Sequence, residues 1–214
     1  MSLRPGQLPE PVDVYTKLLE SYTGDPIRIR SFSEEIVTAY TAHGRHYHTL
    51  QHLRQMLDVL KGVKDQVSDP DTLLFALFYH DIVYDPGRKD NEEKSAELAT
   101  ERLSALGYPA AGRGLCRQMI RATRDHARST HPDINLLTDA DLSILGSEAA
   151  AYTAYASRVR REYGIYPDTV YKPGRRKVLQ HFLGMPFIFK TAYFRAAYES
   201  RARQNIQQEL ETLS

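Results

Sequence analysis

Residues 73–84 read Leu-Leu-Phe-Ala-Leu-Phe-Tyr-His-Asp-Ile-Val-Tyr, and this stretch decides the fold class. It is apolar on every side of a helix, which is typical of a helix that is buried all round. The pair Asp69-Pro70 before it is a helix-start signal, and Asp-Pro-Gly at residues 85–87 is a strong turn signal. The sequence therefore predicts a buried helix that begins at Asp69-Pro70 and ends near Tyr84.

Helical spacing of apolar residues continues on both sides of this segment, and no alternating run is long enough to predict a strand. Residues 31–34 resemble a capping box, whereas Pro132 and residues 166–174 are expected in loops. Further helices are predicted over residues 11–22, 31–40, 47–61, 91–106, 112–126, 139–145, 148–163, 175–183 and 191–213. The sequence therefore predicts an all-α protein in which residues 1–214 form one domain.

Length, charge and composition argue against a membrane protein, a secreted disulfide-bonded protein and a strongly basic nucleic-acid-binding protein. The chain has 214 residues and a formal net charge of +1, so it has no strong field for a long nucleic acid or an anionic membrane. No apolar run approaches the ~20 residues that cross a bilayer, and no signal-peptide pattern is visible. The single cysteine, Cys116, excludes an internal disulfide and suits a reducing compartment. We therefore expect a cytoplasmic protein with neither a membrane nor a long nucleic acid as its partner.

His80 and Asp81 lie side by side in the predicted buried helix. Burying an unpaired carboxylate costs several kcal/mol, so Asp81 needs a cation, a metal or dense hydrogen bonding. A buried His–Asp pair, or an aspartate that reaches the helix end, explains these residues equally well. The pair alone leaves a metal site and a structural role open.

Two histidines lie on the apolar edge of the predicted helix 47–61. On a helical wheel, His52 lies between Met56 and Val59. His48 lies one turn earlier on the same edge. Histidines at i and i+4 can ligate one metal, or divide into a ligand and an acid–base group. Taken singly, each is also explained as a hydrogen-bonded core histidine.

Two aspartates stand near the start of the predicted helix 139–145. In a helix Asp139 and Asp141 point about 200 degrees apart. Asp141 shares its face with Ile144 and Leu145, so it is the inward carboxylate, whereas Asp139 faces away. The alternative is that Asp141 only caps the helix start at Thr138.

Three separate apolar segments thus supply two imidazoles and two carboxylates. Mixed nitrogen and oxygen ligands suit Mn, Mg, Co, Ni, Zn or Fe, and four protein ligands leave open positions at an octahedral ion. A water molecule or a substrate oxygen binds at such a position. The sequence therefore predicts a divalent metal ion, whose ligands are His52, His80, Asp81 and Asp141.

The order His … His-Asp … Asp on helices resembles the HD superfamily of metal-dependent phosphohydrolases. The matching stretches are Tyr47-His48-Thr49-Leu50-Gln51-His52, His80-Asp81 and Asp139-Ala140-Asp141-Leu142. The first of them is also similar to the opening motif of cyclic-nucleotide phosphodiesterases. The chain looks most like a bacterial branch described only as predicted HD phosphohydrolases, whose further motifs stand here at Tyr84-Asp85 and Asp90-Asn91-Glu92. The resemblance implies an HD-domain helical bundle with a motif region of about 46–146 and additional C-terminal helices over about 147–214.

The resemblance implies the same four metal ligands, and it gives His48 the role of the acid that protonates the leaving oxygen. It implies hydrolysis of a small phosphate ester by metal-activated water, with nucleotides as one candidate class. Two other functions stay open: a non-catalytic sensor module that binds metal or nucleotide, and a metal-dependent oxygenase on the same helices. Sensor modules often lose a ligand of the motif, and all four positions are filled here, which favours hydrolysis.

Four more residues are candidates at the site. Asp85 and Glu92 follow the His-Asp motif closely enough to take catalytic roles, although Glu92 is also a type that the first turn of a helix favours. His126 stands where some superfamily members have a histidine for a second metal. We assign His126 and Arg175 to substrate binding; a hydrogen-bonded loop histidine and a solvated arginine are the alternatives.

Overall fold

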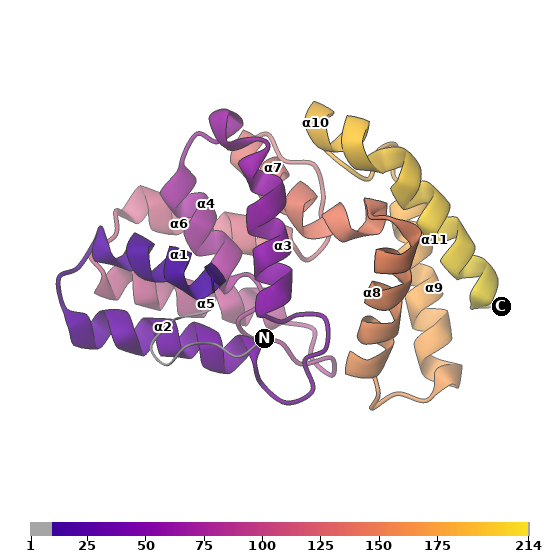
Figure 1. Cartoon of the computed structure of the whole chain (residues 1–214), viewed down its shortest axis with the longest axis horizontal. Helices are drawn as coiled ribbons and strands as arrows, with labels where there is room; N and C mark the ends of the chain where they lie inside the picture. Colours follow the sequence, from indigo (N-terminus) through magenta and orange to yellow (C-terminus); the bar gives the residue numbers. More distant parts are fainter. Residues whose placement is uncertain (1–9, 214) are drawn as a thin grey trace.

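The computed structural model describes residues 10–213, and all regular elements in this part of the chain are helical (Figure 1). The helices are α1 (Glu10–Glu20), α2 (Pro26–Tyr40), α3 (Leu50–Lys61), α4 (Pro70–Tyr79), α5 (Asn91–Ala105), α6 (Ala110–Ala122), α7 (Pro132–Leu142), α8 (Ala149–Glu162), α9 (Asp168–Gly184), α10 (Ala192–Phe194) and α11 (Ser200–Thr212). Short turns of other helix types are η1 (Lys64–Gln66), η2 (Ser143–Gly146) and the π-turn η3 (Arg195–Glu199). The prediction of an all-α protein is confirmed.

Two groups of helices make up the molecule in Figure 1. The first group consists of α1–α7, with α4 at its centre. Helices α8, α9 and α11 form a smaller group beside it, and η2 links α7 to α8. The prediction that residues 1–214 form one domain stays a prediction, and its ends, residues 1–9 and 214, lie outside the described residues.

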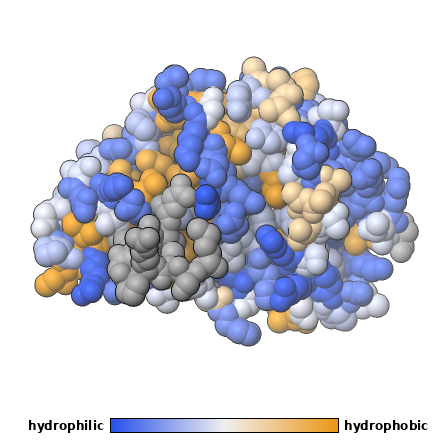
Figure 2. All heavy atoms as spheres, viewed as in Figure 1, coloured by the Kyte–Doolittle hydropathy of each residue, from blue (hydrophilic) through white to orange (hydrophobic). Residues whose placement is uncertain are grey.

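Hydrophilic residues cover most of the face drawn in Figure 2, and apolar residues show through in patches between them. Among the described residues, no helix combines the length and the apolar character needed to cross a membrane.

Aromatic residues of α4 form the centre of the core. Phe75, Phe78 and Tyr79 are fully buried. Tyr15 of α1 packs on Phe78 with ring centroids 4.9 Å apart, and its hydroxyl lies 2.7 Å from that of Tyr79. Buried rings supply much apolar contact, and a hydrogen bond satisfies the two hydroxyls. The expectation that this helix is buried all round is confirmed.

A carboxylate joins the beginnings of α4 and α7. Asp69 caps α4 by accepting from Thr72 N at 3.0 Å, and Pro70 follows at the first helical position. The buried Asp133, in the first turn of α7, accepts from Ser68 N at 2.9 Å and Asp69 N at 2.8 Å. The two helices have nearly equal lengths, so tying their beginnings together brings their C-terminal ends to the same level.

Helix α4 ends at Tyr79, not near Tyr84 as predicted. Side chains take the backbone groups that would continue it. His80 Nδ1 bonds the Leu77 carbonyl at 2.8 Å, and the Tyr40 hydroxyl donates to the Phe78 carbonyl at 3.0 Å. The Tyr40 hydroxyl also accepts a hydrogen bond from the backbone N–H of Asp81 at 3.3 Å. These tertiary contacts place the His-Asp pair at the helix end rather than inside the helix.

Several other helix boundaries were predicted wrongly, because capping and packing outweigh local composition. Helix α2 begins at Pro26 rather than at residue 31, since Asp25 accepts from two backbone N–H groups there. Helix α3 begins at Leu50, so His48 precedes the helix.

Two predicted loops are helical. Helix α7 begins at Pro132 rather than at residue 139, with the His131 side chain accepting at its cap. Proline fits the first position of a helix, where its missing N–H is not needed. Helix α9 begins at Asp168 and continues through Pro173, so the loop predicted over 166–174 is mostly helix. The buried Tyr171 and Arg175 hold this turn against the core in spite of the proline.

Candidate metal centre

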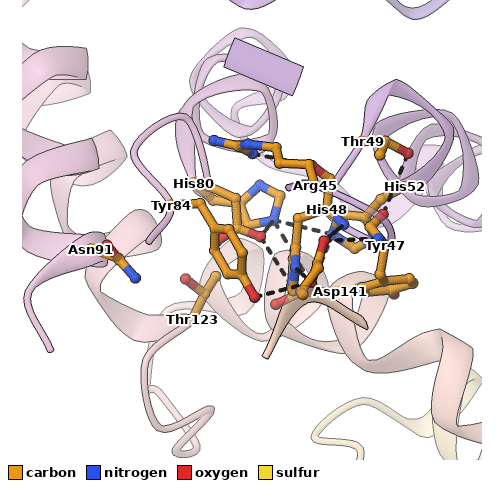
Figure 3. Close-up of polar contacts among 12 residues, drawn as sticks. Arg45, Tyr47, His48, Thr49, His52, His80, Tyr84, Asn91, Thr123 and Asp141 are labelled. Carbon is orange, nitrogen blue, oxygen red and sulfur yellow. Dashed lines mark hydrogen bonds and ion pairs between the residues drawn. The ribbon is translucent and has the colours of Figure 1, made fainter. Parts of the chain in front are cut away.

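Side chains from three helix ends converge on one point, as Figure 3 shows for His52, His80 and Asp141, and Asp81 lies beside His80. His52 Nε2 lies 3.2 Å from His80 Nε2 and 3.2 Å from Asp141 Oδ1. His80 Nε2 lies 3.0 Å from Asp81 Oδ2 and 3.9 Å from Asp141 Oδ1. His52 and His80 are buried, and Asp81 and Asp141 each keep about 15% of their side-chain surface exposed. The structure thus brings together all four residues that the sequence predicts as metal ligands.

Two of the three helices that carry these residues, α4 and α7, favour a cation at this point. His80 follows the last residue of α4, and Asp141 lies in the last turn of α7. The C-terminal end of a helix carries partial negative charge, which attracts cations. His52 comes from the first turn of α3, whose apolar face packs into the core through Leu53 and Met56.

The spacing of the donor atoms fits a metal ion. Two ligands that are each about 2.1 Å from an ion lie about 3.0 Å apart at right angles and about 3.4 Å apart in a tetrahedron. The four separations of 3.2, 3.2, 3.0 and 3.9 Å fall around these values. The ligand atoms of His52, His80 and Asp81 all lie within 4.8 Å of one another; Asp141 is not in this group and approaches the site through the two histidines, at 3.2 and 3.9 Å. The donor set of two imidazole nitrogens and two carboxylate oxygens can therefore hold one divalent ion.

Protonation of the site follows from its charges. Burial lowers the pKa of His80, but the carboxylates of Asp81 and Asp141 outweigh burial and raise it to about 9. Burial raises the pKa of both carboxylates, but the neighbouring histidines outweigh it and hold each pKa below its ordinary value. His80 Nδ1 is already hydrogen-bonded to the Leu77 carbonyl, so its Nε2 atom faces the other donors. A proton on this Nε2 atom is therefore what a metal ion would displace.

Asp139 has a separate structural role. Its fully buried carboxylate accepts from Lys190 N at 2.8 Å and from Thr191 N and Oγ1, both at 2.8 Å. It lies on the other side of α7 from the donor cluster, as the helical wheel predicts for Asp139 and Asp141, but it faces protein and is more buried than Asp141. These bonds attach the segment before α10 to the helix that carries Asp141.

His48 lies beside the four donors, in the turn before α3. Its ring lies 5.8 Å from the ring of His52, and its Nε2 atom lies 3.7 Å from Asp81 Oδ2. Its Nδ1 atom lies 2.7 Å from Glu162 Oε2, and the Tyr84 hydroxyl donates to the same oxygen at 3.0 Å. The pKa of Glu162 is lowered to about 2, because hydrogen bonds from His48 and from backbone N–H groups outweigh the effect of burial.

Glu162 is the residue at this site that the sequence analysis missed. It is the last residue but one of the predicted helix 148–163 and directly follows Arg160-Arg161. A glutamate in such a charged helix end is normally a solvated surface residue. The only signal in the sequence is its period: Tyr155, Val159 and Glu162 follow one another at helical spacing and all three are buried.

His126 completes the polar contacts of Asp141. Its Nε2 atom lies 2.8 Å from Asp141 Oδ2, whereas the other oxygen of that carboxylate faces His52. The backbone of His126 has a φ of +53°, in the left-handed region that side chains other than glycine adopt at a cost. The turn after α6 thus holds this imidazole against the donor cluster in spite of backbone strain.

A cleft of about 660 Å³ opens onto the donor cluster. His48, Asp81, His126 and Asp141 line its inner end. The remaining lining residues are Tyr84, Pro86, Arg88, Lys89, Asn91, Glu92, Thr123, Arg124, Tyr155, Val159, Tyr163, Tyr166, Val170, Tyr171, Gly174, Arg175, Val178 and Phe182. The cleft therefore lies between the first seven helices and the C-terminal pair α8 and α9.

The other three candidate residues have different surroundings. Glu92 lines the cleft, whereas Asp85 is exposed, is not among the lining residues and accepts from Gly87 N at 2.8 Å. Arg175 lines the cleft but is nearly buried, and its guanidinium is paired with Glu209 at 2.8 Å. It also donates to the Tyr155 hydroxyl at 3.3 Å. The guanidinium thus already has partners within the protein.

The two sides of the cleft differ in chemistry. Lys89 and Arg124 give one side positive charge, whereas Arg88 there is paired with Asp90 and Glu92 adds a carboxylate. The side formed by α8 and α9 is mainly aromatic and aliphatic, with Tyr163, Tyr166, Tyr171, Val178 and Phe182. An anionic group and an apolar or planar group can therefore be bound at the same time.

Comparison with known proteins gives one match. The family model described as HD domain matches residues 49–157, just over half of the chain. The matched range includes the four donors, but His48 and Glu162 lie outside it. No curated protein and no solved structure is similar enough to count as a match.

Proposed function

Because the chain belongs to the HD-domain family, whose members bind divalent metals and are commonly metal-dependent phosphohydrolases, we propose that it hydrolyses a small phosphate ester. One observation carries the proposal: the donor atoms of His52, His80, Asp81 and Asp141 converge, and two of these residues, Asp81 and Asp141, line a cleft. A metal buried away from any cleft would be structural, whereas this one would meet a substrate.

The residues of the cleft have distinct tasks in such a reaction. His52, His80, Asp81 and Asp141 would hold a divalent ion, which when bound lowers the pKa of a water molecule and polarises a phosphoryl oxygen. His48 presents Nε2 beside Asp81, from where it can protonate the leaving oxygen.

The substrate we propose is a small phosphorylated molecule with a planar or apolar group, for which a nucleotide is one candidate. Lys89 and Arg124 line the cleft without a side-chain hydrogen bond or ion pair to the described residues, so their charges are available to an anion. Tyr166 and Tyr171 offer ring surface on the opposite side. The net charge of +1 gives no general attraction to a long nucleic acid, and we propose a cytoplasmic protein that acts on small molecules.

The test is a hydrolysis screen with the purified full chain. The protein is freed of metal, then supplied in turn with Mg, Mn, Co, Ni, Zn or Fe, and phosphate release is measured from aryl phosphates, a phosphodiester and nucleoside monophosphates. We expect hydrolysis that requires metal and falls at least about 10³-fold in Asp81→Asn, since that variant loses a ligand.

The controls separate the proposed activity from its alternatives. Asp65→Asn, at an exposed carboxylate of η1 outside the cleft lining, is expected to keep the activity within about threefold. Hydrolysis that is equally fast without metal would contradict the proposal. A protein that binds metal but hydrolyses none of these esters would be better explained as a sensor module or an oxygenase.

A further inference from the structure

Glu162, the last residue of α8, has a fully buried carboxylate that contacts the turn before α3. Its Oε1 atom accepts three backbone N–H groups, from His46 and Tyr47 at 2.8 Å each and from His48 at 2.9 Å. Three consecutive donors on one oxygen fix the position of the carboxylate and of the turn together. The side chain thus lies at a junction between the C-terminal helices and the metal centre.

The second oxygen, Oε2, determines how the ring of His48 is held. It lies 2.7 Å from His48 Nδ1 and accepts from the Tyr84 hydroxyl at 3.0 Å. Because a carboxylate only accepts, the Nδ1 atom of His48 carries a proton in this contact. The Tyr84 ring packs on the imidazole with centroids 4.2 Å apart. The ring can therefore neither flip nor turn, and its Nε2 atom faces the cleft.

We propose that Glu162 is a positioning residue for catalysis, which fixes the tautomer and the orientation of His48 so that Nε2 delivers a proton to the leaving oxygen. As water attacks phosphorus and the bond from phosphorus to the leaving oxygen breaks, the proton moves from His48 Nε2 to that oxygen. The other proton stays on His48 Nδ1, hydrogen-bonded to Glu162. The inference rests on the proposed hydrolysis, and it assigns a part of the catalytic unit to the C-terminal helices, beyond residue 157 where the family match ends.

A glutamine at this position separates positioning from packing. The amide has nearly the shape of the carboxylate, and its carbonyl oxygen must take the place of Oε1, where three N–H groups need an acceptor. The amide NH₂ group then replaces Oε2 and faces His48 Nδ1. The amide NH₂ group and Nδ1–H are both donors and cannot face each other. In Glu162→Gln we therefore expect Nδ1 to lose its proton, so that His48 no longer carries a proton on both nitrogens.

The first measurement is independent of activity. Histidine ring ¹⁵N spectra of the metal-free protein report which nitrogens carry a proton, and the His48 signals are identified by their loss in His48→Gln. We expect a hydrogen-bonded Nδ1–H in the wild type and its loss in Glu162→Gln. The matched control is Glu209→Gln, a largely covered glutamate of α11 paired with Arg175, in which the His48 signals are expected to stay unchanged.

The second measurement compares leaving groups. An alkyl phosphate needs its leaving oxygen protonated, whereas p-nitrophenyl phosphate has a leaving group that departs without help. With metal supplied, kcat of Glu162→Gln is expected to fall about 10²–10⁴-fold on the alkyl ester and less than about tenfold on the aryl ester. The KM values and bound metal are expected to stay near wild type, since Glu162 is not a ligand.

The outcomes are distinguishable. An Nδ1–H signal that persists in Glu162→Gln, or an equal fall in kcat on both esters, would overturn the inference and leave Glu162 with a structural role alone. A wild-type protein that hydrolyses neither ester with any metal would instead overturn the proposed function. In that case the ¹⁵N spectra still decide whether Glu162 sets the tautomer of His48.

Discussion

The histidine and aspartate side chains at the centre are mutually dependent at the scale of single residues. His80 gains a pKa of about 9 from two carboxylates, and those carboxylates stay ionised because of the histidines. In the metal-free protein, protonated His80 therefore takes the place of a cation. A divalent ion would replace this proton and satisfy the same carboxylates.

This exchange predicts how metal binding depends on pH. The folded pKa of His80 lies above its ordinary value of 6.5, so the stability that its proton contributes is complete below pH 6.5 and is lost as pH rises through about 9. Because the metal ion competes with this proton, metal affinity should rise with pH, about tenfold per pH unit between pH 6.5 and 9. Titration calorimetry in buffers of different ionisation enthalpy measures both affinity and released protons. An affinity that is flat between pH 6.5 and 9 would contradict this assignment.

Functional residues can be identified from the sequence where a polar side chain stands on an otherwise apolar helix face. His52, His80 and Asp141 can be identified because each occupies an apolar face, and such positions are costly for polar groups. Glu162 could not be identified in this way, because its helix end is rich in charge and its burial depends on contact with residues more than 100 positions away. Arg175 shows the converse: an arginine after a Pro-Gly pair suggests an exposed anion-binding residue, yet it is nearly buried against Glu209.

Helix ends, rather than helix centres, form the site at the scale of elements. Asp133 ties the beginning of α7 to that of α4, and the opposite ends of these helices deliver Asp141 and His80. The sequence predicts the existence of α4 but not its last residue, because Tyr40 and His80 themselves terminate it. It does not predict the first turns of α7 at all, because local composition there resembles a loop.

The tie between the two helices predicts a large effect on stability. Asp133→Ala removes the acceptor of two part-buried backbone N–H groups, so the free energy of unfolding should fall by about 2–3 kcal/mol. Asp25→Ala is the matched control: it removes an exposed cap of α2 and should cost about 1 kcal/mol. Urea unfolding followed by circular dichroism measures both. Equal losses in the two variants would show that Asp133 is no more than a helix cap.

At the scale of the whole molecule, the C-terminal helices close the cleft and hold a part of the site. Besides the contacts of Glu162, two features attach them to the rest: Asp139 binds the segment before α10, and Gly146 of η2 lies directly against η3. The sequence predicts these helices but not their docking, since neither contact produces a local pattern. The aromatic side of the cleft is likewise formed only when α8 and α9 fold against the first seven helices.

Close packing at Gly146 predicts that no larger residue is tolerated there. A Cβ atom would lie 2.5 Å from the Tyr198 carbonyl oxygen, and backbone cannot move aside easily. Gly146→Ala should therefore destabilise the protein by about 1–3 kcal/mol. Gly114→Ala, in an exposed position of α6 with open space around it, should instead stabilise by up to about 1 kcal/mol. Melting temperatures that shift in the same direction in both variants would contradict this account of η2 and η3.

The buried pair of Arg175 and Glu209 gives a further test of how the C-terminal helices cohere. Arg175→Met removes the counter-ion of the Glu209 carboxylate, which keeps its hydrogen bond from the Tyr152 hydroxyl, and should cost about 3 kcal/mol, whereas Arg175→Met with Glu209→Leu should recover part of this loss. A double-mutant cycle of unfolding free energies measures the coupling. A single variant as stable as the wild type would contradict a structural role for this ion pair.

The central claim is that one divalent ion binds where His52, His80, Asp81 and Asp141 meet. Elemental analysis of the full-length protein after loading with each of the candidate metals and desalting tests it most directly. We predict about one ion per chain in the wild type, and a loss of the ion in Asp81→Asn and Asp141→Asn while helicity is kept. A wild type that retains none of the metals, or variants that retain as much as the wild type, would contradict the account.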